Sequence, residues 1–144
     1  MKKIMLVGRT GAGKTTFCQA IYGQEQRYQK TQAIEVINSA IDTPGEYLEN
    51  RRLYRALIVT SADADLIVLL QDCTDDQCWF APGFAGMFEK PAVGLVTKTD
   101  LAEDEQAIRD AEEKLILAGC ERIFRISSKE LTGINDVKVY IGLI

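Results

Sequence analysis

The sequence contains no histidine among its 144 residues. Zinc sites with imidazole ligands and catalysis by Ser-His or Cys-His pairs are therefore excluded. Any proton transfer must use carboxylates, water or the substrate itself. The four cysteines show no Cys-x2-Cys metal spacing. Only Cys73 and Cys78, which lie in a loop-like stretch, leave redox or metal chemistry open.

Long apolar runs and long basic runs are also missing. No stretch reaches membrane-spanning length, and the first apolar segment begins too close to Met1 for the apolar core of a signal peptide. The net charge is -4 at pH 7 and the pI is near 4.9. We therefore expect a cytoplasmic protein whose partners are neither nucleic acids nor membranes.

The composition that is present is typical of one soluble domain spanning residues 1–144, with no internal repeat or linker. Strand-like and helix-like segments alternate along it. This alternation predicts an α/β three-layer sandwich around a six-stranded, mostly parallel sheet with one antiparallel edge strand. The expected strands are Ile4–Val7, Ala33–Ile37, Ser39–Ile41, Leu66–Gln71, Ala92–Thr97 and Arg122–Ile126.

Helices are expected over Thr15–Tyr22, Asn50–Ser61, Glu103–Ala118 and Gly133–Ile144. In the second of these, Leu53, Leu57 and Ile58 should face inward. The arginines at positions 51, 52 and 55 then form a charged outer face or a surface for a partner or substrate. An aromatic cluster at Trp79, Phe80, Phe84 and Phe88 fits either the core or, if exposed, a protein contact.

A glycine-rich segment follows the first apolar run. Residues 8–15 read Gly-Arg-Thr-Gly-Ala-Gly-Lys-Thr, which satisfies the Gly-x4-Gly-Lys-[Ser/Thr] pattern between a strand and a helix. In such a loop, backbone N–H groups and the helix N-terminus converge on phosphate. Lys14 supplies a charge for the β- and γ-phosphates and acts in catalysis, while Thr15 offers a hydroxyl to Mg²⁺. The predicted phosphate-binding residues are Gly8, Arg9, Thr10, Gly11, Ala12, Gly13, Lys14, Thr15 and Thr16.

The sequence Asp42-Thr43-Pro44-Gly45 follows the predicted hairpin. A carboxylate at the end of a strand beside the phosphate loop can hold Mg²⁺ through a water, and the Gly45 N–H can meet the γ-phosphate. Loss of that phosphate would release the glycine. The segment after Gly45 is therefore a natural switch.

Two further segments indicate which base is bound. The Asp100 carboxylate, in Thr97-Lys98-Thr99-Asp100, can accept hydrogens from N1 and the exocyclic amine of guanine, a match that adenine cannot offer. Lys98 can lay its aliphatic stem over the base. The tripeptide at 127–129 can present an N–H to the guanine carbonyl and cover the ring. The predicted base-binding residues are Thr97, Lys98, Asp100, Ser127, Ser128 and Lys129.

Taken in this order, the motifs resemble those of the G domains of the Ras-like and translation-factor superclass, which have the P-loop NTPase fold. The resemblance extends from Lys3 to the C-terminus. It implies GTP and GDP as ligands with Mg²⁺ as cofactor. It also implies that Thr31, in Lys30-Thr31-Gln32, is the switch threonine that closes on Mg²⁺ and the γ-phosphate and takes part in catalysis.

Within that superclass, the chain resembles the EutP/PduV family of bacterial proteins, which are associated with ethanolamine and propanediol utilisation and with protein-shelled microcompartments. The resemblance rests on the short hairpin Ala33–Ile41, on Lys-Thr-Gln-Ala-Ile-Glu and on Ile-Asp-Thr-Pro-Gly-Glu-Tyr-Leu-Glu-Asn-Arg. It implies a microcompartment shell or a pathway enzyme as a protein partner. It does not establish a reaction.

The chain departs from the G-domain pattern beside the triphosphate. Glu46 stands where many G domains have a glutamine that orients the attacking water. A carboxylate there is repelled by the triphosphate unless Mg²⁺ or K⁺ compensates, so intrinsic hydrolysis should be slow. Thr10 is bulkier than the usual glycine and would crowd an arginine inserted by a partner. Arg9 is a candidate local cation.

Three functions therefore remain open. The first is a GTP-binding switch with slow hydrolysis. The second is an ATP-dependent, acetate-kinase-like phosphotransferase, in which an arginine at 51, 52 or 55 holds a small carboxylate. The third is a microcompartment docking module with vestigial nucleotide binding.

Overall fold

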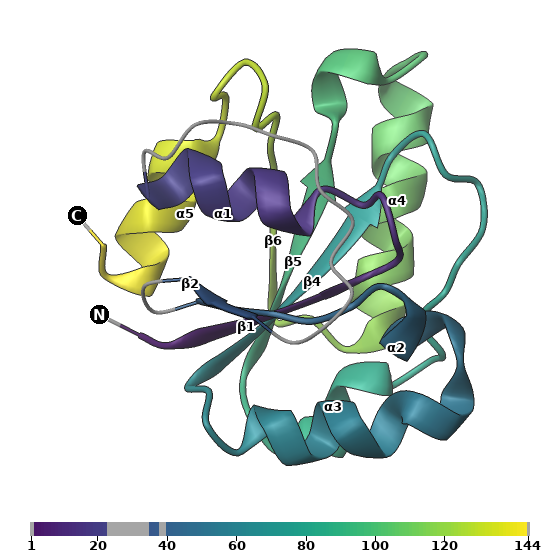
Figure 1. Cartoon of the computed structure of the whole chain (residues 1–144). Helices are drawn as coiled ribbons and strands as arrows, with labels where there is room; N and C mark the ends of the chain where they lie inside the picture. Colours follow the sequence, from purple (N-terminus) through teal and green to yellow (C-terminus); the bar gives the residue numbers. More distant parts are fainter. Residues whose placement is uncertain (1, 23–34, 38–39, 144) are drawn as a thin grey trace.

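The computed structural model describes residues 2–22, 35–37 and 40–143 (Figure 1). In this part of the chain, six strands form one sheet in the order β2-β3-β1-β4-β5-β6. All neighbouring strands are parallel except β2 and β3 at one edge. This confirms the predicted sheet. The strands are β1 (Ile4–Gly8), β2 (Glu35–Ile37), β3 (Ala40–Asp42), β4 (Leu66–Asp72), β5 (Ala92–Thr97) and β6 (Arg122–Arg125).

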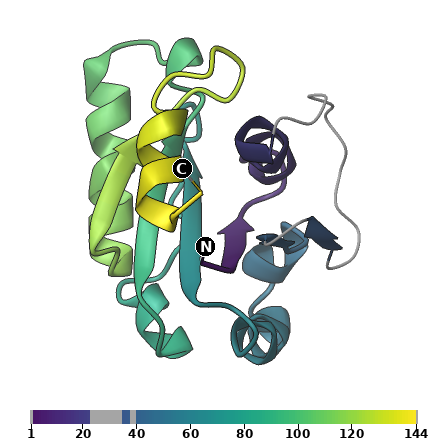
Figure 2. The ribbon, with the colours of Figure 1, turned by 90° about the vertical axis from the view of Figure 1, so that its left-hand side faces the viewer.

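Helices cover both faces of the sheet and complete three layers. Alternate residues of β1 point to opposite faces, so Ile4 and Leu6 belong to the core cluster that includes residues of α1 and α5, and Met5 and Val7 to the cluster that includes residues of α3 and α4. In the side view, α1 and α4 lie on opposite sides of the strands (Figure 2). The helices are α1 (Lys14–Tyr22), α2 (Glu46–Glu49), α3 (Tyr54–Ser61), α4 (Glu105–Ala118) and α5 (Ile134–Ile141), with 3-10 turns η1 (Arg51–Leu53), η2 (Phe84–Phe88) and η3 (Thr99–Leu101).

Two helix predictions need correction. The helical segment expected over Asn50–Ser61 begins at Arg51 as the 3-10 turn η1 and continues as α3, and Asn50 caps it with an extended backbone and a side chain that accepts from the Arg52 N–H. In α3, Leu57 is fully buried, but Ile58 is 42% exposed and does not face inward. The helix expected over Gly133–Ile144 ends at Ile141, where Gly142 adopts a left-handed conformation.

The aromatic cluster belongs to the core. Phe80, Phe84 and Phe88 are buried and pack edge to face, with ring centroids 5.3 to 5.5 Å apart. Trp79 is only partly buried and borders a cavity described below. Among the described residues, no helix has both the length and the apolar character needed to cross a membrane.

Candidate nucleotide site

The described site residues predicted from the sequence lie on segments that follow the carboxyl ends of the parallel strands. Strand β1 leads into the phosphate loop, β3 ends at Asp42, β5 leads to Asp100 and β6 to Ser127. In open α/β sheets, ligands bind at the carboxyl ends of the strands. Thr31 lies outside the described residues, so its predicted role stays a prediction.

The phosphate loop has the backbone that its glycines predict. Gly11 and Gly13 have φ values of 85° and 102°, which residues with a β-carbon rarely adopt. Lys14 opens α1 and is 6% exposed, and its Nζ donates to the carbonyl oxygens of Gly8 at 2.8 Å and Arg9 at 3.1 Å. Burial lowers the pKa of Lys14 to about 8, although the Asp42 and Glu49 carboxylates oppose this shift. The ammonium group therefore lies within the loop. Its burial has a desolvation cost, which a bound polyanion would offset.

The two described residues predicted to bind Mg²⁺ are in direct contact. Thr15 Oγ1 donates to Asp42 Oδ2 at 2.6 Å, and Asp42 is fully buried at the end of β3. Hydroxyl and carboxylate oxygens are ligands that Mg²⁺ prefers, with substrate phosphates supplying others. The described residues contain no group of three or more cysteine, aspartate or glutamate side chains that could hold a metal ion. A Mg²⁺ ion at Thr15 and Asp42 would therefore need further ligands from the substrate.

The segment after β3 packs directly on the phosphate loop. Gly45 is buried so closely against Thr10 that a β-carbon at this position would overlap the Thr10 backbone. Four residues later, Glu49 Oε2 accepts from Thr10 Oγ1 at 2.7 Å and from the Thr10 N–H at 3.2 Å. The side chains of Glu46 and Glu49 are both exposed. The hydrogen bonds from Thr10 identify Glu49 as the carboxylate of α2 that reaches the loop.

The predicted base-binding segments meet at Asp100. Ser127 is fully buried, and its Oγ donates to Asp100 Oδ1 at 2.7 Å, which fixes the carboxylate. Thr99 joins the same two segments, because its N–H and Oγ1 both donate to the Ile126 carbonyl. Thr97 Oγ1 donates to the Ala12 carbonyl at 2.7 Å and so ties the end of β5 to the phosphate loop. The phosphate and base segments are thus linked to each other by hydrogen bonds.

The two lysines predicted to cover the base differ in their surroundings. Lys98 has a left-handed backbone with φ of 60°, and its Nζ forms an ion pair with Asp72 Oδ2 at 2.9 Å. This pair fixes the end of the Lys98 side chain against the end of β4. Lys129 is exposed, and Ser128 is partly buried. The predicted contacts of these residues with a base stay predictions.

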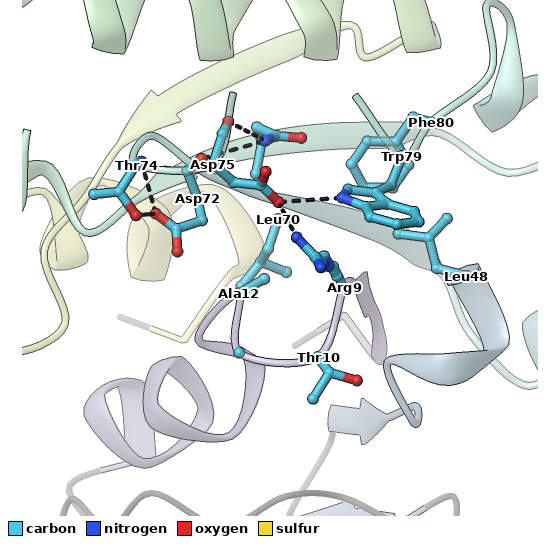
Figure 3. Close-up of a pocket in the computed structure, with 12 residues that line it drawn as sticks. Arg9, Thr10, Ala12, Leu48, Leu70, Asp72, Thr74, Asp75, Trp79 and Phe80 are labelled. Carbon is cyan, nitrogen blue, oxygen red and sulfur yellow. Dashed lines mark hydrogen bonds and ion pairs between the residues drawn. The ribbon is translucent and has the colours of Figure 1, made fainter. Parts of the chain in front are cut away.

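A cavity of about 280 Å³ lies between the phosphate loop and the segment at 70–80 (Figure 3). Arg9 points toward Asp75 and Trp79 there: its Nη1 is 2.9 Å from Asp75 Oδ2, and its guanidinium lies over the Trp79 ring. Trp79 Nε1 donates to the same Asp75 oxygen at 3.1 Å. Burial opposes ionisation of Asp75, but hydrogen bonds from the Gln77 N–H, Arg9 and Trp79 lower its pKa overall.

The predicted acceptor-binding arginines do not line this cavity. The side chains at positions 51, 52 and 55 are exposed on η1 and α3, and the cavity arginine is Arg9. Sequence reasoning missed the roles of Glu49 and Asp75. Glu49 had a readable signal, since a residue four positions after Gly45 lies on the same side of a helix. Asp75 had none, because its partner Arg9 is 66 residues away.

The fold and this arrangement of segments define a P-loop α/β domain of the G-domain type. The chain belongs to the PduV-EutP family, whose profile, described as "Ethanolamine utilisation - propanediol utilisation", matches residues 1–143. It is 44% identical to "Propanediol utilization protein PduV" of Citrobacter freundii, over 99% of this chain and 94% of that protein. It is 34% identical to "Probable acetate kinase EutP" of Escherichia coli strain K12, over 99% of this chain and 90% of that protein.

A more distant similarity links the chain to a GTPase. It is 30% identical to "GTPase Era" of Sinorhizobium medicae strain WSM419, over 96% of this chain and 51% of that protein. The chain therefore corresponds to about half of Era. This similarity agrees with the P-loop fold.

Proposed function

We propose that the protein is a Mg²⁺-dependent guanine-nucleotide-binding protein with slow GTP hydrolysis that serves ethanolamine or propanediol utilisation. The observation that carries the proposal is the Asp100 carboxylate, which the buried Ser127 hydroxyl orients. It lies at the carboxyl ends of the strands, as the phosphate loop does. A fixed carboxylate accepts both hydrogens of the guanine edge. The similarity to Era supports the same assignment.

The residues suited to Mg²⁺ are Thr15 and Asp42, whose side-chain oxygens already lie 2.6 Å apart. When bound, Mg²⁺ would neutralise charge on the β- and γ-phosphates. Lys14 would bind the same phosphates, and Gly45 would offer its N–H to the γ-phosphate. The carboxylates of Glu46 and Glu49 on α2 repel an incoming triphosphate, which supports slow turnover and a role for K⁺ as an additional cation.

The deciding experiment is calorimetry with GTP, GDP, ATP and ADP, with and without K⁺. We expect guanine nucleotides to bind more tightly than adenine nucleotides. Asp100→Asn should weaken GTP and improve xanthosine triphosphate, because the amide can donate to the carbonyl that xanthine carries in place of the guanine amine. A preference of the wild-type protein for ATP would refute guanine specificity.

A second function is favoured by a specific comparison and a specific cavity. The EutP relative is named a probable acetate kinase, and the cavity beside the phosphate loop contains Arg9, a residue type that binds carboxylates in two-point geometry. In this reaction an acetate oxygen attacks the γ-phosphorus while the bond to the bridging oxygen breaks, giving acetyl phosphate and a nucleoside diphosphate. Trapping acetyl phosphate as a hydroxamate would establish it, provided that Arg9→Gln lowers the yield.

The protein partner that we propose is a microcompartment shell or a pathway enzyme in the cytoplasm. Support for it comes from the family's link to the two pathways. Co-purification of the shell with the wild-type protein, and its loss with Lys14→Ala, would show that the contact depends on nucleotide. A contact that persists in Lys14→Ala without any nucleotide affinity would favour the docking module instead.

A further inference from the structure

The phosphate loop already holds an anion that belongs to the protein. One carboxylate oxygen of Glu49 accepts from the Thr10 hydroxyl at 2.7 Å and from the Thr10 main-chain N–H at 3.2 Å. These are the donor types with which such loops hold phosphate oxygens. Glu49 is the last residue of α2, so the contact joins the segment after β3 to the loop after β1.

The contact lies at the end of the loop expected to receive the terminal phosphate. Thr10 packs directly against Gly45, the glycine predicted to meet the γ-phosphate. Glu49 is also near enough to the Lys14 ammonium to interact with it electrostatically. Glu49 is exposed, but a γ-phosphate that reaches Lys14 and Gly45 enters the surroundings of its carboxylate, and the two like charges repel.

We propose that Glu49 sets the preference between nucleoside diphosphate and triphosphate. With no nucleotide or with a diphosphate, its carboxylate stays on Thr10, and a triphosphate must displace it. The inference rests on the proposed function only in requiring that a nucleotide binds the phosphate loop. It concerns the phosphates and not the base, so it applies equally to guanine and adenine nucleotides.

Displacement of Glu49 should be visible in the cavity beside the phosphate loop, which Thr10 also lines. Leu48, the neighbour of Glu49, is 3% exposed and lines the cavity that also contains Trp79, the only tryptophan of the chain (Figure 3). A shift of this four-residue helix would change the surroundings of the indole. Intrinsic fluorescence should therefore respond to a triphosphate and much less to a diphosphate.

The test compares the affinities of the full-length protein for GDP and for a non-hydrolysable GTP analogue. The variants are Glu49→Gln, which removes the charge, and Glu49→Ala, which also removes the acceptor. Glu113→Gln, on the exposed side of α4, is the control that changes net charge equally away from the loop. Removal of an exposed contact that the analogue must otherwise displace predicts roughly three- to tenfold tighter analogue binding in both Glu49 variants, with GDP affinity unchanged. Unchanged GDP affinity also shows that the variants fold.

An analogue-to-GDP affinity ratio in the Glu49 variants equal to that of the wild type, or shifted toward GDP, would overturn the inference and leave the proposed function intact. If the wild-type protein prefers adenine nucleotides, guanine specificity fails, and the same ratio measured with ADP and an ATP analogue decides the role of Glu49. If the wild-type protein binds no nucleotide, the proposed function and the inference both fail.

Discussion

At the scale of single residues, Lys14 determines how nucleotide binding should depend on pH. Burial lowers its pKa in the free protein to about 8. Above that pH the free amine is largely neutral, whereas a bound polyphosphate favours the charged form. We therefore expect binding to take up a proton and affinity to fall as pH rises above about 8.

Calorimetry at pH about 9, one unit above this pKa, in two buffers of different ionisation enthalpy measures that uptake. The two binding heats should differ, and they should converge near pH 7, where Lys14 is already charged. Equal heats at the higher pH would show that Lys14 does not change its protonation.

The lowered pKa of Lys14 also predicts that the ligand-free fold gains stability as pH rises from about 8 toward 10.5, because over this range the Lys14 proton is held by the unfolded chain and not by the folded one.

Ser127 provides a residue-scale test of the base site. Its hydroxyl fixes Asp100 from a fully buried position, so Ser127→Ala leaves the carboxylate free to rotate. We expect GDP affinity to fall about three- to tenfold, which corresponds to one hydrogen bond, with little change for ADP. Competition binding with the two diphosphates checks this. An equal loss for both would indicate general damage to the fold.

At the scale of elements, the packing of α4 on β5 depends on a glycine. A β-carbon on Gly94 would lie 2.8 Å from Leu115 Cδ1 and 3.0 Å from Leu115 Cβ. Gly94→Ala should therefore lower the free energy of unfolding by about 1–3 kcal/mol through overpacking. Gly86→Ala is the matched control, since a β-carbon there meets no atom within 4 Å. Urea denaturation compares them, and equal stability of the two variants would contradict the packing described.

The elements show how far the sequence could predict this fold. Apolar segments and glycines predicted the six strands and α4 closely, because burial and chain reversal act locally. The short helix α2 before Asn50 and the 3-10 start of the segment after it were not predicted, since both depend on how Asn50 caps the chain through the Arg52 N–H. The positions of the phosphate and base motifs followed from spacing. The contacts of Thr10 with Glu49 and of Arg9 with Asp75 did not, because they join segments 39 and 66 residues apart.

At the scale of the whole molecule, the site connects segments that leave β1, β3, β5 and β6. A nucleotide that spans them should stabilise the native fold as a unit by mass action, by about 2.7 kcal/mol at a ligand concentration of 100 Kd. We expect the unfolding temperature to rise with Mg²⁺ and GDP, to rise less with ADP, and to stay unchanged in Lys14→Ala. Thermal unfolding measures all three, and a rise in Lys14→Ala would place the ligand elsewhere.

The central claim is that segments at the carboxyl ends of the strands bind one nucleotide, the phosphates through the loop at 8–15 and the guanine base through Asp100. A crystal structure with Mg²⁺ and a GTP analogue tests it most directly. The account predicts phosphates on the main-chain amides of the loop, the metal beside Thr15 and Asp42, and the guanine edge on the Asp100 carboxylate. An analogue bound away from the loop, or a base with no contact to Asp100, would contradict it.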